Sequence, residues 1–551
     1  MKLPEIERVL SSARAEAAFV LAACVLAALY RGAGVMSVLL GGIPPISHIS
    51  YDGVYYAQIA RNILAGDGLG WEAMIFPALQ PVFIAAIAYV TGIDNLAFLS
   101  GYVSQVAGIA LLVPVYLLVR DLLGKSAAVA AVFVIIPYPH LVAISSADTV
   151  ESLYAFFVFL SIYLGYRALS GAPPVWLAFT GISLGLTYLA RPEGLIVFAG
   201  FLPIAAWRLY EAGGRGLALR GLGIIAAAFF VVSLPYMVFL TKSYKRVVLS
   251  PKLPYESVVM KSKVFGEDMS FRDVEGLTAK GEIVWREKGG AGLVLGYFRE
   301  NPARFVRSYL GNLVSELPWN VGNSSHLEGY PIVYPVYIWL LAMAGFAFLV
   351  LPPGRRWAAL LLLAPFANLF VYPVFTKGFW IYHAPYVPAL VTFAAGGVLL
   401  LSRETERLTG RAVPLLLVLV LTWGGYSAYI RYSCSPQQVE AVNFKSVISE
   451  ESKKVGRWAR VNIGTDVTYM TTWSRLVYYL GGRWVSIPMD DHKRVVSYGI
   501  KNHADYIVEE LVGDAAIAGP EYTDVPSLEH YFTYQSPDAP YAVVFWKIKN
   551  R

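Results

Sequence analysis

The feature that most constrains this chain is a series of long apolar segments with almost no charged residues. Hydrophobic residues make up 56% of the 551 residues and charged residues only 15%, whereas average soluble domains carry about 25% charge. An apolar helix needs roughly 20 residues to cross a bilayer. We therefore predict a multi-span α-helical membrane protein with about 11 spans. These spans are expected at 17–40, 96–119, 127–143, 153–169, 176–190, 195–207, 223–240, 332–351, 358–374, 386–401 and 414–430.

The basic residues predict how these spans are oriented. Lys2, Arg8 and Arg14 precede the first apolar segment, which places the N-terminus in the cytoplasm by the positive-inside rule. Arg120 and Arg403 likewise follow segments that we expect to run inward. Because the predicted number of spans is odd, everything after the last one should be extracytoplasmic. The predicted location is the cell membrane, crossed many times.

We divide the chain into a membrane domain at 1–431 and a small extracytoplasmic α/β domain at 432–551. The second part has alternating strand and helix signals, among them the strands TDVTYMTT, RWVSIPM, DYIVEE and YAVVFWKIK, which is typical of layered α/β domains. Two outer loops are expected, at 41–95 and 241–331. The apolar run at 79–90 is too short to span, so we predict an interfacial or re-entrant helix. Within the second loop, 297–317 is expected to form an amphipathic helix anchored by Phe298, Phe305, Tyr309 and Leu313.

Charge and cysteine content exclude several classes of partner. The net charge of +7 is modest for this length, and no basic run with interleaved aromatic residues suggests nucleic acid. Positive cytoplasmic loops and an anionic membrane surface account for it better. The two cysteines, Cys24 and Cys434, lie in very different parts of the chain, so they imply neither a disulfide framework nor a metal cluster.

The stretch SYDGVYYAQIARNILAGDGLGWEAMIFPALQP, from Ser50 to Pro81, follows the first span directly. Its first part is expected to form a short helix in the membrane interface. Tyr55, Ile59 and Ile63 would form the apolar side, Gln58, Arg61 and Asn62 the polar side, and Gly66, Gly68 and Gly70 would end the helix. Asp52 opens this helix and is our catalytic candidate, because an acidic residue there would face a lipid surface. The alternative is that Asp52 only caps the helix, as Asp often does.

Further polar residues are expected at the same outer face, where polar groups are costly unless they are paired or used. They are Glu72, Asp148, Glu151, Arg191, Glu193, Lys377, Tyr382 and His383. Arg191, Lys377 and His383 could meet an anionic group such as phosphate. No set of residues has metal-ligand spacing, and Glu72 with His383 would supply two ligands for a divalent metal at most.

Each of these assignments has a structural alternative. Asp148 could cap the helix that follows Ser145 and Ser146, with Glu151 at the third helical position. Arg191, which precedes Pro192, could simply end a helix and bind its carbonyl groups. His383 could be an interface histidine rather than a ligand.

Several segments in order resemble the GT-C integral-membrane glycosyltransferases. They are YDGVYYAQIARNILAGDGLGW, FPALQPVFIAAIAYVTG, SSADTVESLYAFFVFLSIYLGYRAL, GISLGLTYLARPEGLIVF and IYHAPYVPALVTFAAGGVLLL. The most similar groups are the protein O-mannosyltransferases and the lipid A aminoarabinose transferases. The likeness covers most of the chain, and its specificity comes from the order of the segments.

The resemblance implies a fold, a donor and a set of site residues. The donor would be a polyprenyl-phosphate-linked sugar, such as a dolichyl-phosphate sugar, used on the outer side of the membrane. Asp52 matches the catalytic Asp of the first outer loop, Asp148 and Glu151 the second acidic landmark, and Arg191 the Arg-Pro. Substrate binding is assigned to Tyr55, Tyr56, Glu72, Asp148, Glu151, Arg191, Lys377, Tyr382 and His383.

Three positions depart from the family pattern. Gly53 stands where an acidic residue is common, and His383 where arginine is frequent. Phe76-Pro77 replaces the usual Lys-Pro-Pro, so the lysine that would bind the lipid phosphate is missing. The Trp-Trp-Asp signature of oligosaccharyltransferases is also absent from the sequence.

The predicted reaction needs little else. Phosphate is a good leaving group, so one carboxylate that accepts the proton of the acceptor hydroxyl is enough, and Asp52 would be this general base. Attack opposite the leaving group should invert the anomeric centre. The acceptor would be a protein, a lipid or a glycan. Two alternatives stay open: a transporter or flippase of lipid-linked substrates, and a non-catalytic assembly subunit.

Overall fold

The computed structural model describes residues 9–10, 12–32, 50–245, 247–250, 275–277, 283–285, 291–316, 336–371, 374, 385–410, 418–420, 424, 450–471, 475–488, 490–513, 522–537 and 539–549. The chain forms two compact units. The helical unit consists of Met1–Pro45, Ile59–Ser250 and Arg307–Cys434. The mixed unit consists of Ile46–Gln58, Pro251–Val306 and Ser435–Arg551.

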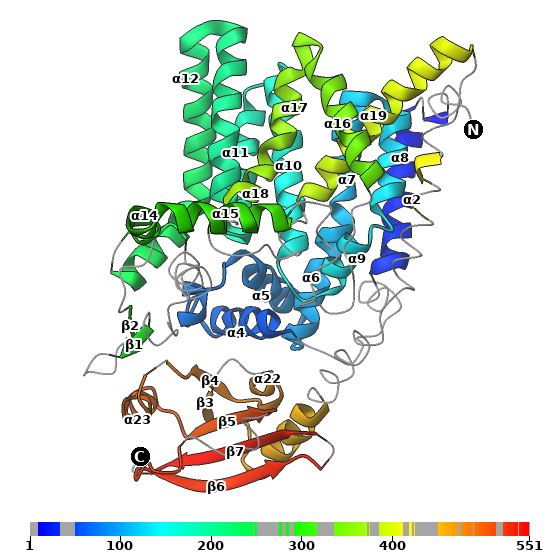
Figure 1. Cartoon of the computed structure of the whole chain (residues 1–551). Coiled ribbons are helices and arrows are strands. Elements are labelled where there is room, and N and C mark those ends of the chain that lie inside the picture. The colour runs from blue at the N-terminus through cyan, green and yellow to red at the C-terminus, as the bar shows by residue number, and fades with distance from the viewer. Residues whose placement is uncertain are drawn as a thin grey trace. The chain divides into compact units, whose positions relative to one another are not determined.

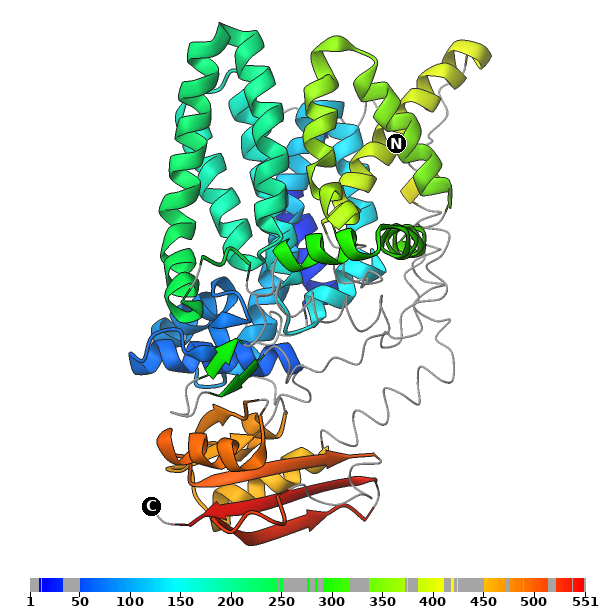
Figure 2. The same ribbon diagram turned by 60° about the vertical axis from the view of Figure 1, so that its left-hand side comes forward.

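The helical unit is built from apolar helices, the longest of which run side by side (Figures 1 and 2). They are α2 (Ala13–Arg31), α6 (Leu96–Ala110), α7 (Leu112–Leu123), α8 (Lys125–Ile135), α9 (Pro139–Ser146), α10 (Glu151–Leu169), α11 (Val175–Ala190), α12 (Gly194–Tyr244), α16 (Val336–Val350), α17 (Arg356–Leu363) and α19 (Tyr386–Thr409). Further elements of this unit are η1 (Trp71–Met74), α5 (Leu79–Thr91), η5 (Ala364–Ala367) and α18 (Asn368–Val371). Helix α4 (Tyr51–Ala65) belongs to the mixed unit up to Gln58 and to the helical unit from Ile59.

Among the described residues, five helices are long and apolar enough to cross a membrane, or six if the bent pair α8 and α9 forms one span. Some helices that we predicted as spans, such as α11 and α16, are apolar but shorter than 18 residues. Much of the last predicted span, 414–430, lies outside the described residues. The count of 11 spans therefore stays a prediction.

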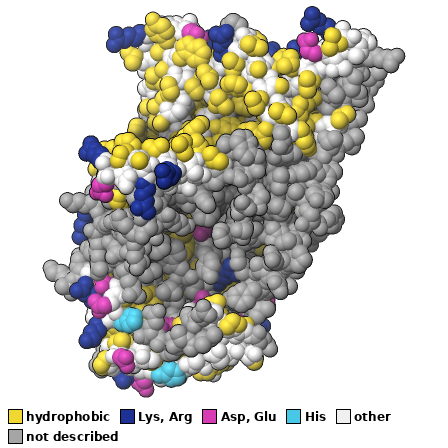
Figure 3. Space-filling view, viewed as in Figure 1, with side chains coloured by type: hydrophobic (Ala, Val, Ile, Leu, Met, Phe, Trp, Pro, Cys, Tyr) yellow, Lys and Arg dark blue, Asp and Glu magenta, His cyan; other side chains and the backbone are white. Residues whose placement is uncertain are grey.

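The exposed surface of these helices is apolar, as expected of a membrane protein. Large exposed side chains include Leu21, Phe179, Phe230, Val231 and Met343. Figure 3 shows hydrophobic side chains covering this region, with Lys and Arg side chains at the upper edge of the view. The chain is a membrane protein by this pattern.

Helix α12 is two helices rather than one. Its backbone is not helical at Gly213 and Gly214. The φ angle of Gly214 is 72°, a positive value that glycine adopts more easily than other residues. The rings of Phe198 and Phe229, one from each arm, stack with centroids 3.9 Å apart. The arms therefore form an antiparallel hairpin (Figure 1), as predicted from the apolar segments at 195–207 and 223–240.

The predicted amphipathic helix at 297–317 is also two helices, α14 (Ala291–Glu300) and α15 (Pro302–Glu316). The break is local in origin: the Asn301 side chain accepts a hydrogen bond from the Arg304 N–H at 3.1 Å, and Pro302 occupies the first helical position. Asn at the N-cap followed by Pro starts a new helix. The prediction of one continuous helix was wrong at this point.

The C-terminal segment of the mixed unit, Ser435–Arg551, contains a five-stranded sheet in the order β4-β3-β5-β7-β6. Its strands are β3 (Thr468–Thr471), β4 (Arg483–Ser486), β5 (Tyr506–Val512), β6 (Leu528–Gln535) and β7 (Tyr541–Ile548). Strand β3 is parallel to β4 and β5, while β7 is antiparallel to β5 and β6. Sequence reasoning missed β6. A separate hairpin in this unit pairs β1 (Glu275–Leu277) with β2 (Ile283–Trp285).

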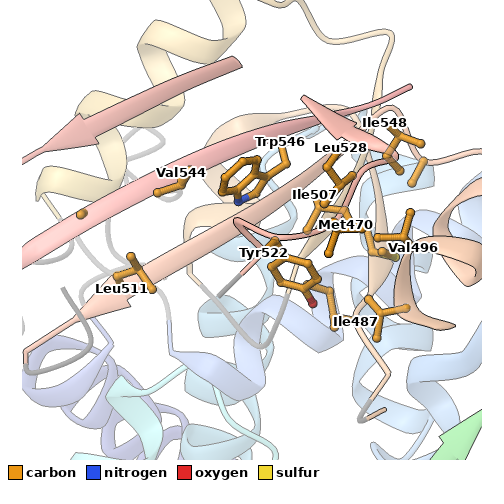
Figure 4. Close-up of a cluster of buried hydrophobic side chains, with 14 residues drawn as sticks. Met470, Ile487, Val496, Ile507, Leu511, Tyr522, Leu528, Val544, Trp546 and Ile548 are labelled. Atoms are coloured by element: carbon orange, nitrogen blue, oxygen red, sulfur yellow. The ribbon is translucent and has the colours of Figure 1, made fainter. Parts of the chain in front are cut away.

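Helices and two apolar clusters cover the faces of this sheet. The helices are 450–462, α22 (Leu476–Leu480) and α23 (His492–Lys501). One cluster includes Met470, Ile507, Val544 and Trp546 (Figure 4). The other includes Tyr469, Val508, Val543 and Phe545. Neighbouring residues of one strand belong to different clusters, because successive side chains point to opposite faces.

Candidate functional site

Asp52 lies in the first turn of α4, and its side chain is half-buried. The capping position is taken by Ser50: its hydroxyl accepts a hydrogen bond from the Gly53 N–H at 3.0 Å, and its carbonyl accepts one from the Val54 N–H at 3.2 Å. Ser50 therefore occupies the N-cap position, and Asp52 lies inside the first turn of the helix. The capping alternative for Asp52 is not what the structure contains.

The helix that carries Asp52 is buried on more than its predicted apolar side. Tyr55 and Ile59 are buried as expected, but Gln58, predicted on the polar side, is also buried. Tyr56 is buried as well, while Arg61 and Asn62 are half-buried. Gln58 is thus a polar residue on the predicted polar side that the structure buries, because the pattern within one helix does not show what packs against its other faces.

Glycines end α4 and hold Glu72 in place. Helix α4 ends at Ala65, and Gly66, Gly68 and Gly70 have positive φ angles, as predicted. A Cβ atom at Gly70 would lie 2.1 Å from Asn62 Nδ2 and 2.6 Å from Glu72 Oε2, so a larger residue would displace both side chains. Asn62 Nδ2 donates a hydrogen bond to Glu72 Oε2 at 3.3 Å.

Glu72 is a buried carboxyl group in η1, between α4 and α5. It is 5% exposed, and burial raises its pKa to about 7. The tyrosines of the second arm of α12 fix this turn: Tyr236 donates to the Ala73 carbonyl at 2.9 Å and Tyr244 to the Met74 carbonyl at 2.8 Å. The side chain is therefore held in a rigid setting in which it accepts a proton near neutral pH.

The second acidic stretch is positioned by serines of α6. The Ser100 hydroxyl donates to the Asp148 carbonyl at 3.2 Å, and the Ser104 hydroxyl donates to the Thr149 carbonyl at 2.5 Å. Helix α10 begins at Glu151 after Val150, without a side-chain capping hydrogen bond. The capping alternative for Asp148 and Glu151 is therefore not observed either.

Glu151 instead pairs with Arg191, which comes from the end of α11. Arg191 is 1% exposed and Glu151 is 2% exposed. Arg191 Nη1 donates to Glu151 Oε1, and Arg191 Nη2 and Nε donate to the Glu193 carboxylate at 3.0 and 3.3 Å. One guanidinium thus lies between two carboxylates in a buried setting, where each charge must be paired to be tolerated.

Two further residues surround this ion cluster. The Arg191 guanidinium lies 5.8 Å from the centre of the Tyr154 ring, within the range of cation–π interactions. The Tyr154 hydroxyl accepts a hydrogen bond from Asn368 Nδ2 at 3.1 Å. In the described part of the chain, Glu151 Oε2 is buried and has no hydrogen-bond partner.

The Arg191 guanidinium donates to two carboxylates of the chain itself and in this way holds Glu151. Its burial and fork geometry suit that task. Its role in binding a phosphate stays a prediction. Sequence reasoning grouped Glu193 with this face without a role, and it missed Tyr154 and Asn368, because an apolar helix and a distant asparagine carry no local signal of a contact.

The remaining predicted site residues are not all described. Lys377, Tyr382 and His383 lie outside the described residues. Within the described ranges, no group of three or more His, Cys, Asp or Glu side chains is arranged to hold a metal ion. The hydrogen-bond partner of Glu72 is the side-chain amide of Asn62. This pair therefore offers a metal ion one carboxyl group, that of Glu72. A divalent metal held by Glu72 and His383 stays a prediction.

Comparisons with known proteins found one similar sequence family and several similar folds. A family described as dolichyl-phosphate-mannose-protein mannosyltransferase matches residues 77–243. This range contains Asp148, Glu151 and Arg191 but not Asp52. A comparison with curated proteins gave no match.

Solved structures resemble the chain over most of its length. ArnT from Cupriavidus metallidurans bound to undecaprenyl phosphate matches with a TM-score of 0.55 and 12% identity, over 97% of this chain and 98% of that one. The oligosaccharyltransferase AglB from Archaeoglobus fulgidus, in complex with an inhibitory peptide and a dolichol-phosphate, has a TM-score of 0.51 and 14% identity, over 95% of this chain and 73% of that one. At these identities the likeness is one of fold. It agrees with the fold that the sequence resemblance implied.

Proposed function

We propose that the chain transfers a sugar from a polyprenyl-phosphate donor to an acceptor hydroxyl on the outer side of the membrane. The observation that carries this proposal is the fold shared along nearly the full length of both chains with a protein bound to undecaprenyl phosphate. The match of 77–243 to the dolichyl-phosphate-mannose family supports the same class of donor. The sugar is a hexose or a pentose, and the acceptor is a protein, a lipid or a glycan.

In the proposed reaction Asp52 acts as general base. The acceptor hydroxyl oxygen attacks the anomeric carbon of the sugar, and its proton passes to the Asp52 carboxylate. The bond between the anomeric carbon and the phosphate oxygen breaks, and the polyprenyl phosphate leaves with the electron pair. Because one carboxylate acts from the side opposite the leaving group, the anomeric configuration inverts. The position of Asp52 in the first turn of a helix supports this role, since an anion is stabilised there.

The other residues have supporting roles in the proposal. Arg191 fixes the Glu151 carboxylate, and Glu151 with Asp148 orients the sugar. Tyr55, Tyr56, Glu72 and Tyr382 belong to the substrate-binding region. Lys377 and His383 supply positive charge for the departing phosphate, which is the usual way that such charge is stabilised.

The decisive experiment measures transfer from radiolabelled polyprenyl-phosphate sugars in membranes that contain the wild-type protein or the variant Asp52→Asn. We expect the variant to lose about 10²- to 10⁴-fold in rate, the usual contribution of a general base. Asp67→Asn is the matched control, because Asp67 is an exposed acid in the turn that follows the same helix. Its rate should be that of the wild type.

Two results would contradict the proposal. Full transfer activity of Asp52→Asn would exclude Asp52 as the base. Movement of the labelled lipid across the membrane by both forms, without a labelled product, would favour the transporter alternative.

A further inference from the structure

The beginning of α4 contacts an edge strand of the sheet within the mixed unit. The ring centre of Tyr55 lies 5.2 Å from that of Trp484, and the ring planes meet at 63°. Edge-to-face pairs at this distance are favourable beyond the area they bury. Both side chains are buried, Tyr55 at 1% and Trp484 at 5% exposure.

Trp484 is held by the sheet but is a member of neither apolar cluster described above. It lies in β4, which is an edge strand of the sheet, and its indole N–H donates to the Thr471 carbonyl of β3 at 3.3 Å. This hydrogen bond fixes the ring on the sheet. The aromatic partner of the ring is then supplied by α4, more than four hundred residues earlier in the chain.

Tyr55 is the third residue after Asp52 in α4. Residues three apart in a helix lie on neighbouring parts of one face. A contact that fixes the Tyr55 ring therefore fixes the rotation of the first turn about the helix axis, and with it the direction of the Asp52 side chain. A displacement of about 1 Å in a reacting group can cost roughly 10²-fold in rate.

We propose that Trp484 is a positioning residue for Asp52, and that the C-terminal sheet takes part in the reaction by holding the first turn of α4 through Tyr55. This inference rests on the proposed function, because it assumes that Asp52 is the base. It gives the C-terminal α/β segment a role in the rate of the chemical step rather than in binding of the donor.

The test compares kcat and KM for the lipid-linked donor in Trp484→Ala, Trp484→Phe and a matched control. The control is Trp546→Phe: this tryptophan of the same sheet is also buried, donates to Glu509 and belongs to the apolar cluster in Figure 4. We expect Trp484→Ala to lower kcat about 10- to 100-fold per folded molecule with KM nearly unchanged. Trp484→Phe should recover most of kcat, because it keeps an aromatic ring against Tyr55. Trp546→Phe should lower the thermal midpoint without lowering kcat per folded molecule.

A second measurement keeps the inference testable if Trp484→Ala fails to fold. In the double variant Tyr55→Leu with Trp484→Leu, the loss in kcat should be close to that of either single variant, because both remove one contact. Losses that multiply would overturn the inference, and so would an equal loss of kcat in Trp546→Phe.

Failure of the inference can be told apart from failure of the proposed function. In a chain with Cys24 and Cys434 replaced by serine, Tyr55→Cys and Trp484→Cys should be joined by a short bifunctional thiol reagent whether or not Asp52 is the base. Absence of this cross-link would overturn the contact itself. A cross-link together with full activity of Asp52→Asn would overturn the proposed function and, with it, the positioning role.

Discussion

At the scale of single residues, the buried cluster of Arg191, Glu151 and Glu193 makes a clear prediction about stability. Arg191→Gln would remove the cation that pairs with the buried Glu151 and the half-buried Glu193. Breaking a buried ion pair by removing one partner costs about 3–5 kcal/mol. We expect a lower thermal midpoint of the detergent-solubilised protein, measured by unfolding in the absence of substrate.

The control for this prediction is an exposed ion pair. Arg407 pairs with Glu404 at 3.4 Å, and their side chains are 78% and 50% exposed. Arg407→Gln should change stability by less than about 1 kcal/mol. Equal effects of the two substitutions would show that Arg191 is not held in a buried ion cluster.

Glu72 predicts a dependence of stability on pH. Its pKa in the folded protein is about 7, against an ordinary value of 4.5. Between these values the folded state keeps the proton that the unfolded state has lost. The contribution of Glu72 to stability is therefore greatest at low pH and falls as the pH rises to about 7, by about 3 kcal/mol in all. In Glu72→Gln this component should vanish. Thermal midpoints measured from pH 4.5 to 8 would reveal it, and an unchanged slope in the variant would assign the effect to another group.

At the same scale, the sequence was informative where the chemistry is local and silent where it is not. The helix after Asp52 and the glycines that end it follow from spacing alone. The capping role of Ser50 depends on backbone geometry at one residue, and the burial of Gln58 depends on other parts of the chain. The Glu151–Arg191 pair joins residues 40 positions apart. The sequence could predict that both residues lie at the outer face of the membrane, but it could not show that they form an ion pair with each other.

At the scale of elements, the apolar runs predicted the positions of α10, α11 and the two arms of α12, because a long run of apolar residues is a strong local signal. Strand β6 was missed for the opposite reason. It is an edge strand with one neighbour, β7, and all of its residues from Glu529 onward are exposed or half-buried. A strand that packs on one side and is short of apolar residues gives a weak periodic signal.

The close contact between α16 and α19 gives a prediction at this scale. A Cβ atom at Gly345 of α16 would lie 1.7 Å from the Phe393 carbonyl oxygen of α19. Small residues allow such an approach between membrane helices. Gly345→Ala should therefore push the helices apart and destabilise the protein by about 1–3 kcal/mol, as a lower thermal midpoint would show.

Gly223→Ala is the matched control for this variant. Gly223 lies in α12, and a Cβ atom there would meet nothing within 4 Å. Alanine is favoured over glycine in a helix by up to about 1 kcal/mol, so this variant should be as stable as the wild type or more stable. A neutral result for Gly345→Ala would mean that the two helices can separate without cost.

At the scale of the whole molecule, the order of the segments along the chain identified the fold although identity to the solved structures is only 12–14%. The fold can be identified at such low identity because it depends on which segments are apolar and on where the polar residues lie between them. Both features are kept when many individual residues are substituted. The specificity for a sugar or an acceptor depends on individual side-chain contacts. Those vary with every substitution, so neither the fold nor the order of segments determines them.

The predicted orientation in the membrane is a property of the whole chain and can be tested directly. Arg215 lies at the turn between the arms of α12, and Glu529 lies in β6; both side chains are exposed. The predicted topology has an odd number of spans between them, which places Arg215 in the cytoplasm and Glu529 outside. After replacement of Cys24 and Cys434 by serine, Glu529→Cys should react with a membrane-impermeant maleimide in intact cells, and Arg215→Cys only after permeabilisation. Labelling of both in intact cells would require an even number of crossings between Arg215 and Glu529, and the sheet would then share a side of the membrane with the basic turn.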